Sequence, residues 1–579
     1  MANLKAVLQR PKVSASYQRN AFDRSFTPNF HYQLGGLQPF MAEPVIAGSH
    51  MKLNRSIFQR TAAVNTAAFP KVDTHCEFFY VPLRLLWSYW NDFKLNIQDY
   101  NSSYQVNWDN AGTVTAHNPI LVPSFDLRNL QNEIVGWLSG HFNAAQPSAH
   151  FALKSQALGA NRLLDQLGYG CTFSYQSWQD PATSPLSNFR VNAFKLLAYQ
   201  KVYYDHFRNT AYESNDPSAY NADGTFTPNA AFDDAILKKI LTYRYVNYRK
   251  DYFQSIYPAL NYTISSPSGP QWQVPSSVQY NMPYGSQSVN AYTGSAGQTF
   301  LSNSPDSTTG VSYTTVQQIR ASFALDKLLR ASAYAPKHVK DQFEARYGVK
   351  GVETGNESIR IGAYMNDIII QEVTSLADTS TGNNPSNLGE IGGKGVGYDA
   401  FGKDIEFTAK EDGIILGLCY SMPRTSYDSL RIDNWNVKDT REDFFIPEFM
   451  DLGMQPMYRY EGFWTHIALP STMNDLIGYK DRYSEYKVGI DQNHGLFNLN
   501  NQLSDFVVHS NRSYLASYSG TGVDVSYFKV KPTDMDPVFV QGTSVDDWNT
   551  DKFITHLNVK FIVNQNMSIH GQPRLGGLV

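Results

Sequence analysis

The sequence predicts a mainly β protein in which one β scaffold carries large helical and loop insertions. Segments with the alternating pattern of half-buried strands lie towards the two ends of the 579-residue chain. Segments with helical periodicity, and long polar loops, lie between them. The chain also holds 37 Tyr and 34 Phe, residue types that are enriched in strands. No internal repeat is visible, so we expect a single scaffold.

Four segments carry the strand signals. In residues 556–564 (HLNVKFIVN) and 404–410 (DIEFTAK), apolar side chains alternate with mostly polar ones, as in strands with one buried face. Residues 413–421 (GIILGLCYS) are apolar almost throughout and predict a fully buried strand. Residues 75–82 (HCEFFYVP) predict another strand, which its proline ends.

Helical spacing of apolar residues, with capping residues at several ends, predicts the helices of the middle region. The predicted helices are 127–138, 153–167, 189–207, 234–243, 321–332 and 336–348. The residues expected to cap their starts are Ser124 or Asp126 for the first, Ser187 for the third, Asp233 for the fourth and a Thr315–Gln318 capping box for the fifth. Gly168 ends the second, and the last begins at Pro336 and stops at Gly348.

The charge balance excludes two classes of protein. The chain has 48 Lys and Arg against 52 Asp and Glu, a formal charge of −4, which argues against a globally basic DNA-binding protein and against an acidic disordered chain. Only 17% of residues are charged, below the usual ~25%. Few charges and many tyrosines are typical of surface that other surface covers, although a large β protein would share the aromatic content.

The N-terminal region is basic, whereas the rest of the chain is mildly acidic. Residues 1–60 carry a net charge of +6, and the remainder carries −10. This arrangement favours a nucleic-acid tether, and an exposed, solvated terminus is the alternative. The predicted DNA contacts in this arm are Lys5, Arg10, Lys12 and Arg19.

A second basic segment, residues 238–253 (KKILTYRYVNYRKDYF), interleaves cations with tyrosines. Cations for phosphate and rings for stacking are what single-stranded nucleic acid requires. Arg244, Arg249 and Lys250 are therefore further candidate DNA contacts. The alternative is a set of basic side chains that extend around a packed helix end.

Two loops stand out by composition. Residues 252–319 contain one charged side chain, Asp306, and are rich in small polar residues with spaced aromatics. This composition is typical of adaptable contact loops, and a disordered linker is the alternative. Residues 375–402 are rich in Gly and Asn and predict a flexible loop. Their GGKGVG, residues 392–397, lacks the Ser or Thr that follows the lysine of a phosphate-binding loop.

No pattern indicates catalysis, a metal or a cofactor. The chain has no zinc-binding histidine pair on a helix, no nucleophile elbow and no C-x-x-C. Its three cysteines, Cys76, Cys171 and Cys419, support neither a disulfide framework nor a zinc ribbon. Because there is no apolar signal region at the start, we expect a soluble protein made in a reducing compartment.

Long stretches along the whole chain resemble the major capsid protein of the Microviridae, and most closely its gokushovirus-like branch, the small single-stranded DNA phages. The blocks, in family order, are AFDRSFTPNFHYQLGGLQPFMAEPVIAGSHMKLNRSIFQR (21–60), CEFFYVPLRLLWSYWNDF (76–93), RKDYFQS (249–255), IRASFALDKLLRASAYAPKHVKDQFEARYGV (319–349), EDGIILGLCYSMPRTSYDSL (411–430), REDFFIPEFMDLGMQPM (441–457), GYKDRYSEYK (478–487) and NVKFIVNQNMSIHGQPRLGGL (558–578). Residues 97–186 and 258–316 depart from the family pattern.

The resemblance implies an eight-stranded antiparallel jelly roll with large insertions and no catalysis. It implies a T=1 icosahedral shell of sixty copies around circular single-stranded DNA, assembled in the bacterial cytoplasm with other virion proteins. The implied parts are a basic arm and inner segment (1–50), a jelly-roll domain (51–579), a helical and loop insertion (97–250), a surface protrusion at the three-fold axis (258–316) and the flexible loop (375–402).

The protrusion is the predicted site of attachment to a host receptor, with a glycan as candidate, because Tyr and Asn suit glycan recognition. Its candidate contact residues are Trp272, Tyr280, Tyr284 and Tyr292. Two other functions remain open at this point, a carbohydrate-binding jelly-roll module and a secreted glycosidase on a β scaffold. The absence of a signal region, and three cysteines that support no disulfide framework, count against secretion.

Overall fold

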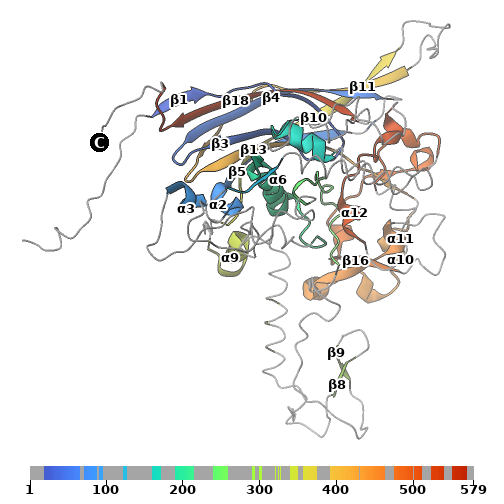
Figure 1. The fold of residues 1–579 in the computed structure, drawn as a ribbon. Coiled ribbons are helices and arrows are strands. Elements are labelled where there is room, and N and C mark those ends of the chain that lie inside the picture. Colours follow the sequence, from blue (N-terminus) through green and yellow to red (C-terminus); the bar gives the residue numbers. More distant parts are fainter. Residues whose placement is uncertain are drawn as a thin grey trace, which may run out of the picture.

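One ten-stranded antiparallel sheet folds over on itself in the computed structural model, and its two halves, each called a sheet below, pack face to face. The structure describes residues 19–64, 69, 71–87, 90–95, 122–126, 159–170, 190–213, 239–258, 290–293, 299–302, 320, 324, 327, 339–349, 356–374, 391–429, 431–462, 475–499, 501–510, 523–539 and 551–569. The two sheets form most of the upper part of Figure 1.

The first sheet, called the β18 sheet below, has the order β1 or β2, β18, β4, and β11 or β12. Its strands are β1 (Asn20–Asp23), β2 (Asn29–Tyr32), β4 (His50–Val64), β11 (Ile391–Asp399), β12 (Ile405–Thr408) and β18 (Phe553–Gln565). The second, the β13 sheet, has the order β3, β13, β5, β10. Its strands are β3 (Gln38–Val45), β5 (Val72–Pro82), β10 (Ile359–Thr374) and β13 (Gly413–Pro423).

Strand β10 joins the two sheets. Its first part pairs with β5 and its last six residues pair with β11, all antiparallel. If β1 and β2 are counted as one strand, and β11 and β12 as another, eight strands form two four-stranded sheets. This is the arrangement of a jelly roll with insertions, so the predicted fold class is confirmed.

The strand predictions are confirmed, and burial explains their sequence patterns. Along β18 every second residue, from Phe553 to Gln565, is buried between the sheets, which is the alternation seen in the sequence. Strand β13 is buried on both faces at nearly every position, as its continuous apolar run predicts. Strand β5 ends at Pro82, as expected.

Two long insertions interrupt the scaffold. The first, residues 83–358, connects β5 to β10, and the second, residues 424–552, connects β13 to β18. The first contains α2 (Leu83–Leu86), α3 (Trp90–Leu95), β6 (Ser124–Asp126), β7 (Arg190–Asn192), α6 (Phe194–Val202), the π-helix η2 (Tyr203–Phe207), β8 (Asn290–Thr293), β9 (Thr299–Ser302) and α9 (Val339–Tyr347).

The second insertion is built mainly from short elements around its own apolar cluster. They are β14 (Tyr427–Asp428), α10 (Asn434–Val437), η3 (Arg441–Asp443), η4 (Pro447–Leu452), β15 (Met454–Tyr458), α11 (Arg459–Gly462), β16 (Leu476–Asp481), η6 (Ser484–Tyr486), β17 (Gln492–Asn493), η7 (Gly495–Phe497), η8 (Ser504–Phe506), α12 (Val525–Phe528) and η9 (Asp536–Val538).

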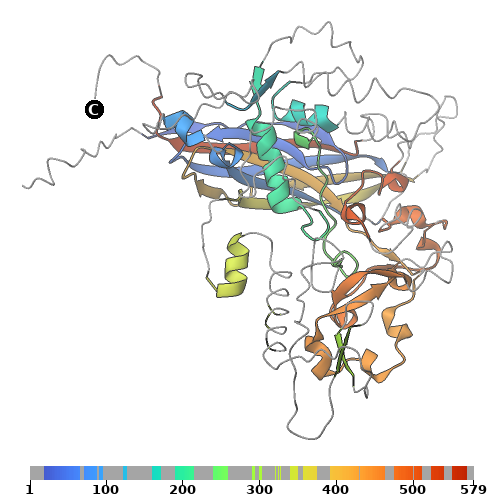
Figure 2. The same ribbon diagram turned by 60° about the horizontal axis from the view of Figure 1, so that its bottom comes forward.

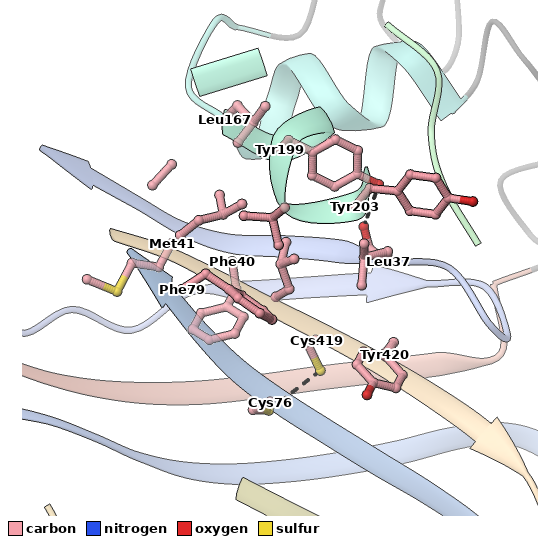
Figure 3. Packing of buried hydrophobic residues seen from close by; sticks show 14 of the residues in the cluster. Leu37, Phe40, Met41, Cys76, Phe79, Leu167, Tyr199, Tyr203, Cys419 and Tyr420 are labelled. Atoms are coloured by element: carbon pink, nitrogen blue, oxygen red, sulfur yellow. Dashed lines mark hydrogen bonds between the residues drawn. The ribbon is translucent and has the colours of Figure 1, made fainter. Parts of the chain in front are cut away.

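Both insertions lie on the β13-sheet side of the sandwich, as Figures 1 and 2 show. Helix α6 and η2 cover the outer face of that sheet, where Phe79 packs against Phe207 with ring centroids 5.7 Å apart and Phe207 packs edge-on against Tyr420. Figure 3 shows this layer together with part of the core. This cover explains why β13 is apolar on both faces.

Cys76 and Cys419 face each other across β5 and β13 in the core, with their Sγ atoms 3.7 Å apart. Both are buried free thiols, and Cys171 lies outside the described residues. No helix in the described ranges is long and apolar enough to cross a membrane.

The helix predictions differ in outcome. Residues 159–166 are helical and the chain turns at Gly168, whose φ of +80° is the left-handed conformation expected of a C-terminal glycine. The predicted helix 189–207 begins only at Phe194, because Arg190–Asn192 pair as β7 with β6. Helix α9 ends before Gly348, as predicted.

Other predicted helices are only partly described. Ser124 and Asp126 belong to strand β6, and the predicted helix 127–138 that they would cap lies outside the described residues. The predicted helices 234–243 and 321–332 lie largely outside them as well.

The predicted flexible loop 375–402 is wrong for residues 391–399, which form β11 between β10 and β4. Residues 375–390 lie outside the described residues. The glycines of GGKGVG are in a strand because the neighbouring chain approaches closely. The amide of Gly395 donates to Thr61 Oγ1 at 2.8 Å, and a Cβ at this glycine would lie 2.5 Å from Thr61 Cγ2.

Gly395→Ala is therefore expected to lower the free energy of unfolding by about 1–3 kcal/mol, the usual cost of overpacking a core. Gly489→Ala is the matched control, because a Cβ there meets no atom within 4 Å. Urea unfolding of the isolated subunits measures both. Equal stability of the two variants would mean that β11 does not pack as described.

Candidate nucleic-acid interface

No element among the described residues covers the outer face of the β18 sheet, in contrast to the outer face of the β13 sheet. Alternate residues of β4, β11 and β18 point away from the core on this face and are half-buried or exposed. Ile554 keeps 59% of its surface exposed and Tyr398 keeps 69%. In Figure 1 this face lies on the side of the sandwich opposite the insertions.

Neighbouring strands bring rings and a cation together at the centre of this face. Phe58 of β4 lies directly between Tyr398 of β11 and His556 of β18, and Arg60 pairs with Ile554. The Arg60 guanidinium lies over the Phe58 ring, 5.1 Å from its centroid. These five residues are called the Arg60 patch.

The cations beside the patch are paired with carboxylates. Lys52 lies 2.7 Å from Glu406, and Lys560 lies 3.3 Å from Asp404. The hydrogen bond from Lys52 lowers the pKa of Glu406, and hydrogen bonds from Asn54 and Lys560 lower that of Asp404. Arg60 makes no ion pair with a carboxylate in the described part of the chain. A cation with exposed rings beside it suits phosphate contact and base stacking.

The basic arm joins the fold at one edge of this sheet. Asn20 pairs with Gln565, so Arg19 before β1 and Asn566 after β18 leave the sheet next to each other. Arg19 donates to Asn566 Oδ1 at 3.0 Å and to the Gly48 carbonyl at 3.2 Å, both at the surface. Lys5, Arg10 and Lys12 lie outside the described residues.

The second predicted group lies on the other side of the sandwich. Arg249 and Lys250 are exposed, whereas Arg244 is held inside the first insertion. The Arg244 side chain donates to Gln200 Oε1 at 2.8 Å and to Tyr204 Oη at 3.0 Å, and it stacks over Tyr203. The structure therefore does not bring the arm and Arg244, Arg249 and Lys250 to one surface.

Arg244 borders a surface cavity of about 690 Å³ between the two insertions. Lys529 lies in its wall, where its ammonium donates to the Tyr203 hydroxyl and lies 3.3 Å from Glu213. Burial lowers the pKa of Lys529 from 10.5 to about 8.

This shift predicts a pH dependence of stability. The folded protein binds the Lys529 proton less tightly than the unfolded chain, so its contribution to stability rises between pH 8 and 10.5. Lys529→Met should remove about 1–2 kcal/mol of the rise in the free energy of unfolding between pH 7.5 and 9.5. Urea titrations at both pH values measure it, and parallel profiles for the two proteins would contradict the assignment.

The candidate attachment residues are mostly beyond the described ranges. Trp272, Tyr280 and Tyr284 lie outside them, and Tyr292 belongs to β8, where its backbone pairs with Phe300 of β9. This hairpin lies on the insertion side, far from the β18 sheet in Figure 1. No group of metal-binding side chains occurs within the described part of the chain.

Sequence reasoning missed the Arg60 patch. The signal was present in RSIFQR, residues 55–60, where Phe58 and Arg60 share one face of an alternating strand. Strand pairing was needed to place Tyr398 and His556 next to them, because these residues are hundreds of positions away.

The family model and the two relatives that match this chain are all described as capsid proteins. The family model described as "Capsid protein (F protein)" matches residues 12–117 and 170–574. The chain is similar to "Capsid protein VP1" of Bdellovibrio phage phiMH2K, with 21% identity over 570 residues that cover 94% of this chain and 91% of the relative. It is also similar to "Capsid protein VP1" of Chlamydia phage 1, with 22% identity over 573 residues that cover 84% and 85%.

Proposed function

This chain belongs to the capsid protein (F protein) family of the Microviridae, and from that membership we propose that it builds the shell of a small single-stranded DNA phage. Its role is structural, that of a major capsid protein in the virion. Sixty copies form a T=1 icosahedral shell that encloses circular DNA, together with other virion proteins. The subunits assemble in the cytoplasm of the host bacterium.

The observation that carries the proposal is the asymmetry of the sandwich. Within the described residues, α6 and η2 of the first insertion cover one outer face, and the other is an open sheet that bears the Arg60 patch and the attachment point of the basic arm. A shell needs one face for the genome and one for the exterior. The open face supports contact with phosphates and bases, and the insertions support the outer surface.

This orientation divides the predicted DNA contacts. Lys5, Arg10, Lys12 and Arg19 belong to the arm, for which we propose DNA contact together with the Arg60 patch. Arg249 and Lys250 face the insertion side. The Arg244 guanidinium is held within the first insertion by its hydrogen bonds to Gln200 and Tyr204. The proposal of DNA contact therefore rests on the arm and the patch.

Electron microscopy of purified material tests the proposal. We expect closed particles of uniform diameter that protect DNA from nuclease. A carbohydrate-binding module or a glycosidase would instead be a monomer or small oligomer. A monodisperse monomer at physiological salt, with no particles under any assembly condition, would refute it.

Host attachment is proposed for the protrusion, residues 258–316, at the three-fold axis. The segment is nearly free of charge, and its β8–β9 hairpin lies on the outward side in the orientation above. Three copies meeting at an axis could bury aromatic side chains that one copy cannot. Trp272, Tyr280, Tyr284 and Tyr292 are the proposed contacts with a host receptor.

Replacement of residues 262–312 by a short Gly/Ser linker should leave closed shells that adsorb poorly to host cells. Adsorption of purified shells, wild type against variant at equal particle number, measures the effect. Normal adsorption by intact variant shells would exclude the attachment role. Failure to form shells would instead make the segment part of the assembly interface.

A further inference from the structure

Cys76 and Cys419 lie directly opposite each other on β5 and β13, the two central strands of the β13 sheet. Opposite residues of an antiparallel pair have Cα atoms about 4.5–5.5 Å apart, and their side chains leave the sheet on the same face. A disulfide bond requires Cα atoms about 4.4–6.8 Å apart. The strand register therefore suits a disulfide, which needs rotation of the two side chains but no shift of register.

The two sulfur atoms point toward each other, as Figure 3 shows. They are 3.7 Å apart, compared with about 2.05 Å in a disulfide bond. Both side chains have 0% of their surface exposed, so only a small reagent can reach them. Because both thiols belong to one chain, a bond between them does not depend on shell assembly.

Arg55 of β4 places a positive charge in the core beside this dithiol. It is fully buried, and its Nη1 donates to Asp399 Oδ2 at 2.6 Å. Its guanidinium lies 5.1 Å from the ring centre of Tyr364, the residue of β10 that pairs with Cys76. Arg55 Nε and Nη2 have no hydrogen-bond partner among the described residues. A buried cation with such N–H groups stabilises a thiolate in its neighbourhood.

The two thiols differ in how readily they ionise. The hydrogen bond between the sulfurs, aided by the charge of Arg55, lowers the pKa of Cys76. Burial raises the pKa of Cys419, whose thiol donates to Tyr32 Oη at 3.7 Å. Since the thiolate is the reactive form of cysteine, Cys76 is the nucleophile of the pair and Cys419 is the resolving thiol.

We propose that Cys76 and Cys419 are a site of oxidation by small peroxides, which convert the dithiol into a disulfide bond between β5 and β13. The Cys76 thiolate attacks one oxygen of hydrogen peroxide, the O–O bond breaks, and Cys76 becomes a sulfenic acid while hydroxide leaves with the proton of the Cys76 thiol as water. The Cys419 thiol then attacks the sulfur of the sulfenic acid, which forms the S–S bond and releases a second water. The dithiol loses two electrons and the peroxide gains them.

The position of this bond in the chain gives it a large effect. The two cysteines are 343 positions apart, and the whole first insertion lies between them. A disulfide restricts the unfolded chain more strongly when it closes a longer loop. For the shell proposed above, the reducing cytoplasm keeps the thiols reduced during folding and assembly, and peroxide forms the bond after release. The scaffold is then stabilised once assembly is complete.

Thiol counting and peptide mapping test the site. Purified full-length protein is treated with a small molar excess of hydrogen peroxide, quenched in acid and unfolded with N-ethylmaleimide. We expect the number of free thiols to fall from three to one, and mass spectrometry to find Cys76 linked to Cys419. Three free thiols after treatment, or a linkage through Cys171, would overturn the proposal.

Single variants separate the roles of the two cysteines. In Cys419→Ala the resolving thiol is absent, so peroxide should leave Cys76 as a sulfenic acid that dimedone labels. In Cys76→Ala the labelling of Cys419 should be at least tenfold weaker. Cys171→Ala is the matched control and should form the same linkage as wild type. Equal labelling in the first two variants would refute the assigned roles.

Thermal unfolding measures the stabilisation. Oxidised wild type should unfold about 5 °C or more above the reduced protein, and dithiothreitol should reverse the rise. Peroxide should leave the unfolding temperature of Cys76→Ala unchanged. The same rise in Cys76→Ala, or none in a wild type shown to carry the linkage, would refute the stabilising effect.

Discussion

Reversal of the four arm cations, Lys5, Arg10, Lys12 and Arg19 to Glu, is expected to yield closed shells that contain little or no DNA. Each cation that contacts a phosphate releases counterions, and loss of several such contacts lowers affinity by orders of magnitude. Folding should survive, because Arg19, the arm cation within the described residues, makes its hydrogen bonds at the surface. The readout is nuclease-protected DNA per particle.

The matched control is charge reversal on the opposite side of the sandwich, Arg249→Glu with Lys250→Glu. These exposed residues face the insertion side, so the control shells should package DNA normally. A normal genome in the arm variant would show that the arm is a solvated terminus. Loss of DNA in the control would show that the subunit is oriented the other way round in the shell.

Glu461→Gln is expected to destabilise the second insertion by about 3–5 kcal/mol, the cost of leaving a buried charge without its partner. Glu461 pairs with Lys480, and the two side chains are only 1% and 2% exposed. Tyr252 donates to Glu461 Oε2 at 3.1 Å, and the Lys480 ammonium lies 4.0 Å from the centre of the Tyr252 ring. Burial lowers the pKa of Lys480, which indicates how costly the unpaired ammonium would be.

Denaturant unfolding measures the free energy of unfolding of Glu461→Gln beside two control variants. The double variant Glu461→Gln with Lys480→Met removes both charges and should recover much of the loss. Glu406→Gln breaks the exposed pair between Glu406 and Lys52, whose side chains are 53% and 46% exposed, and should leave the free energy of unfolding almost unchanged. A Glu461→Gln variant within 1 kcal/mol of wild type would contradict the buried pair.

The scaffold strands were predictable because their signals are local. In β18 and β12 the alternation follows directly from one buried face, and in β13 the apolar run follows from two. Strand β11 was missed because its glycines are usually found in loops. They are required here by the close approach of Thr61, which no local pattern reveals.

The candidate interface was predictable only in part. The sequence shows that cations are close in the chain, but not which partners they meet in the fold. Arg244 illustrates the difference, since Gln200 and the tyrosines of η2 occupy its guanidinium. The Arg60 patch required knowledge of strand order, because the β18 sheet assembles it from three distant segments.

The first and last strands of the scaffold lie side by side, with Asn20 of β1 paired with Gln565 of β18. Because both ends of the scaffold meet at one sheet edge, a short linker between them should give a circular permutant with the same strand order. New termini could be opened between β8 and β9, at residues 294–298, where no sheet of the scaffold is cut. In the orientation proposed above, such a permutant would move both chain ends from the genome side to the exterior, where a fused peptide would be displayed rather than enclosed.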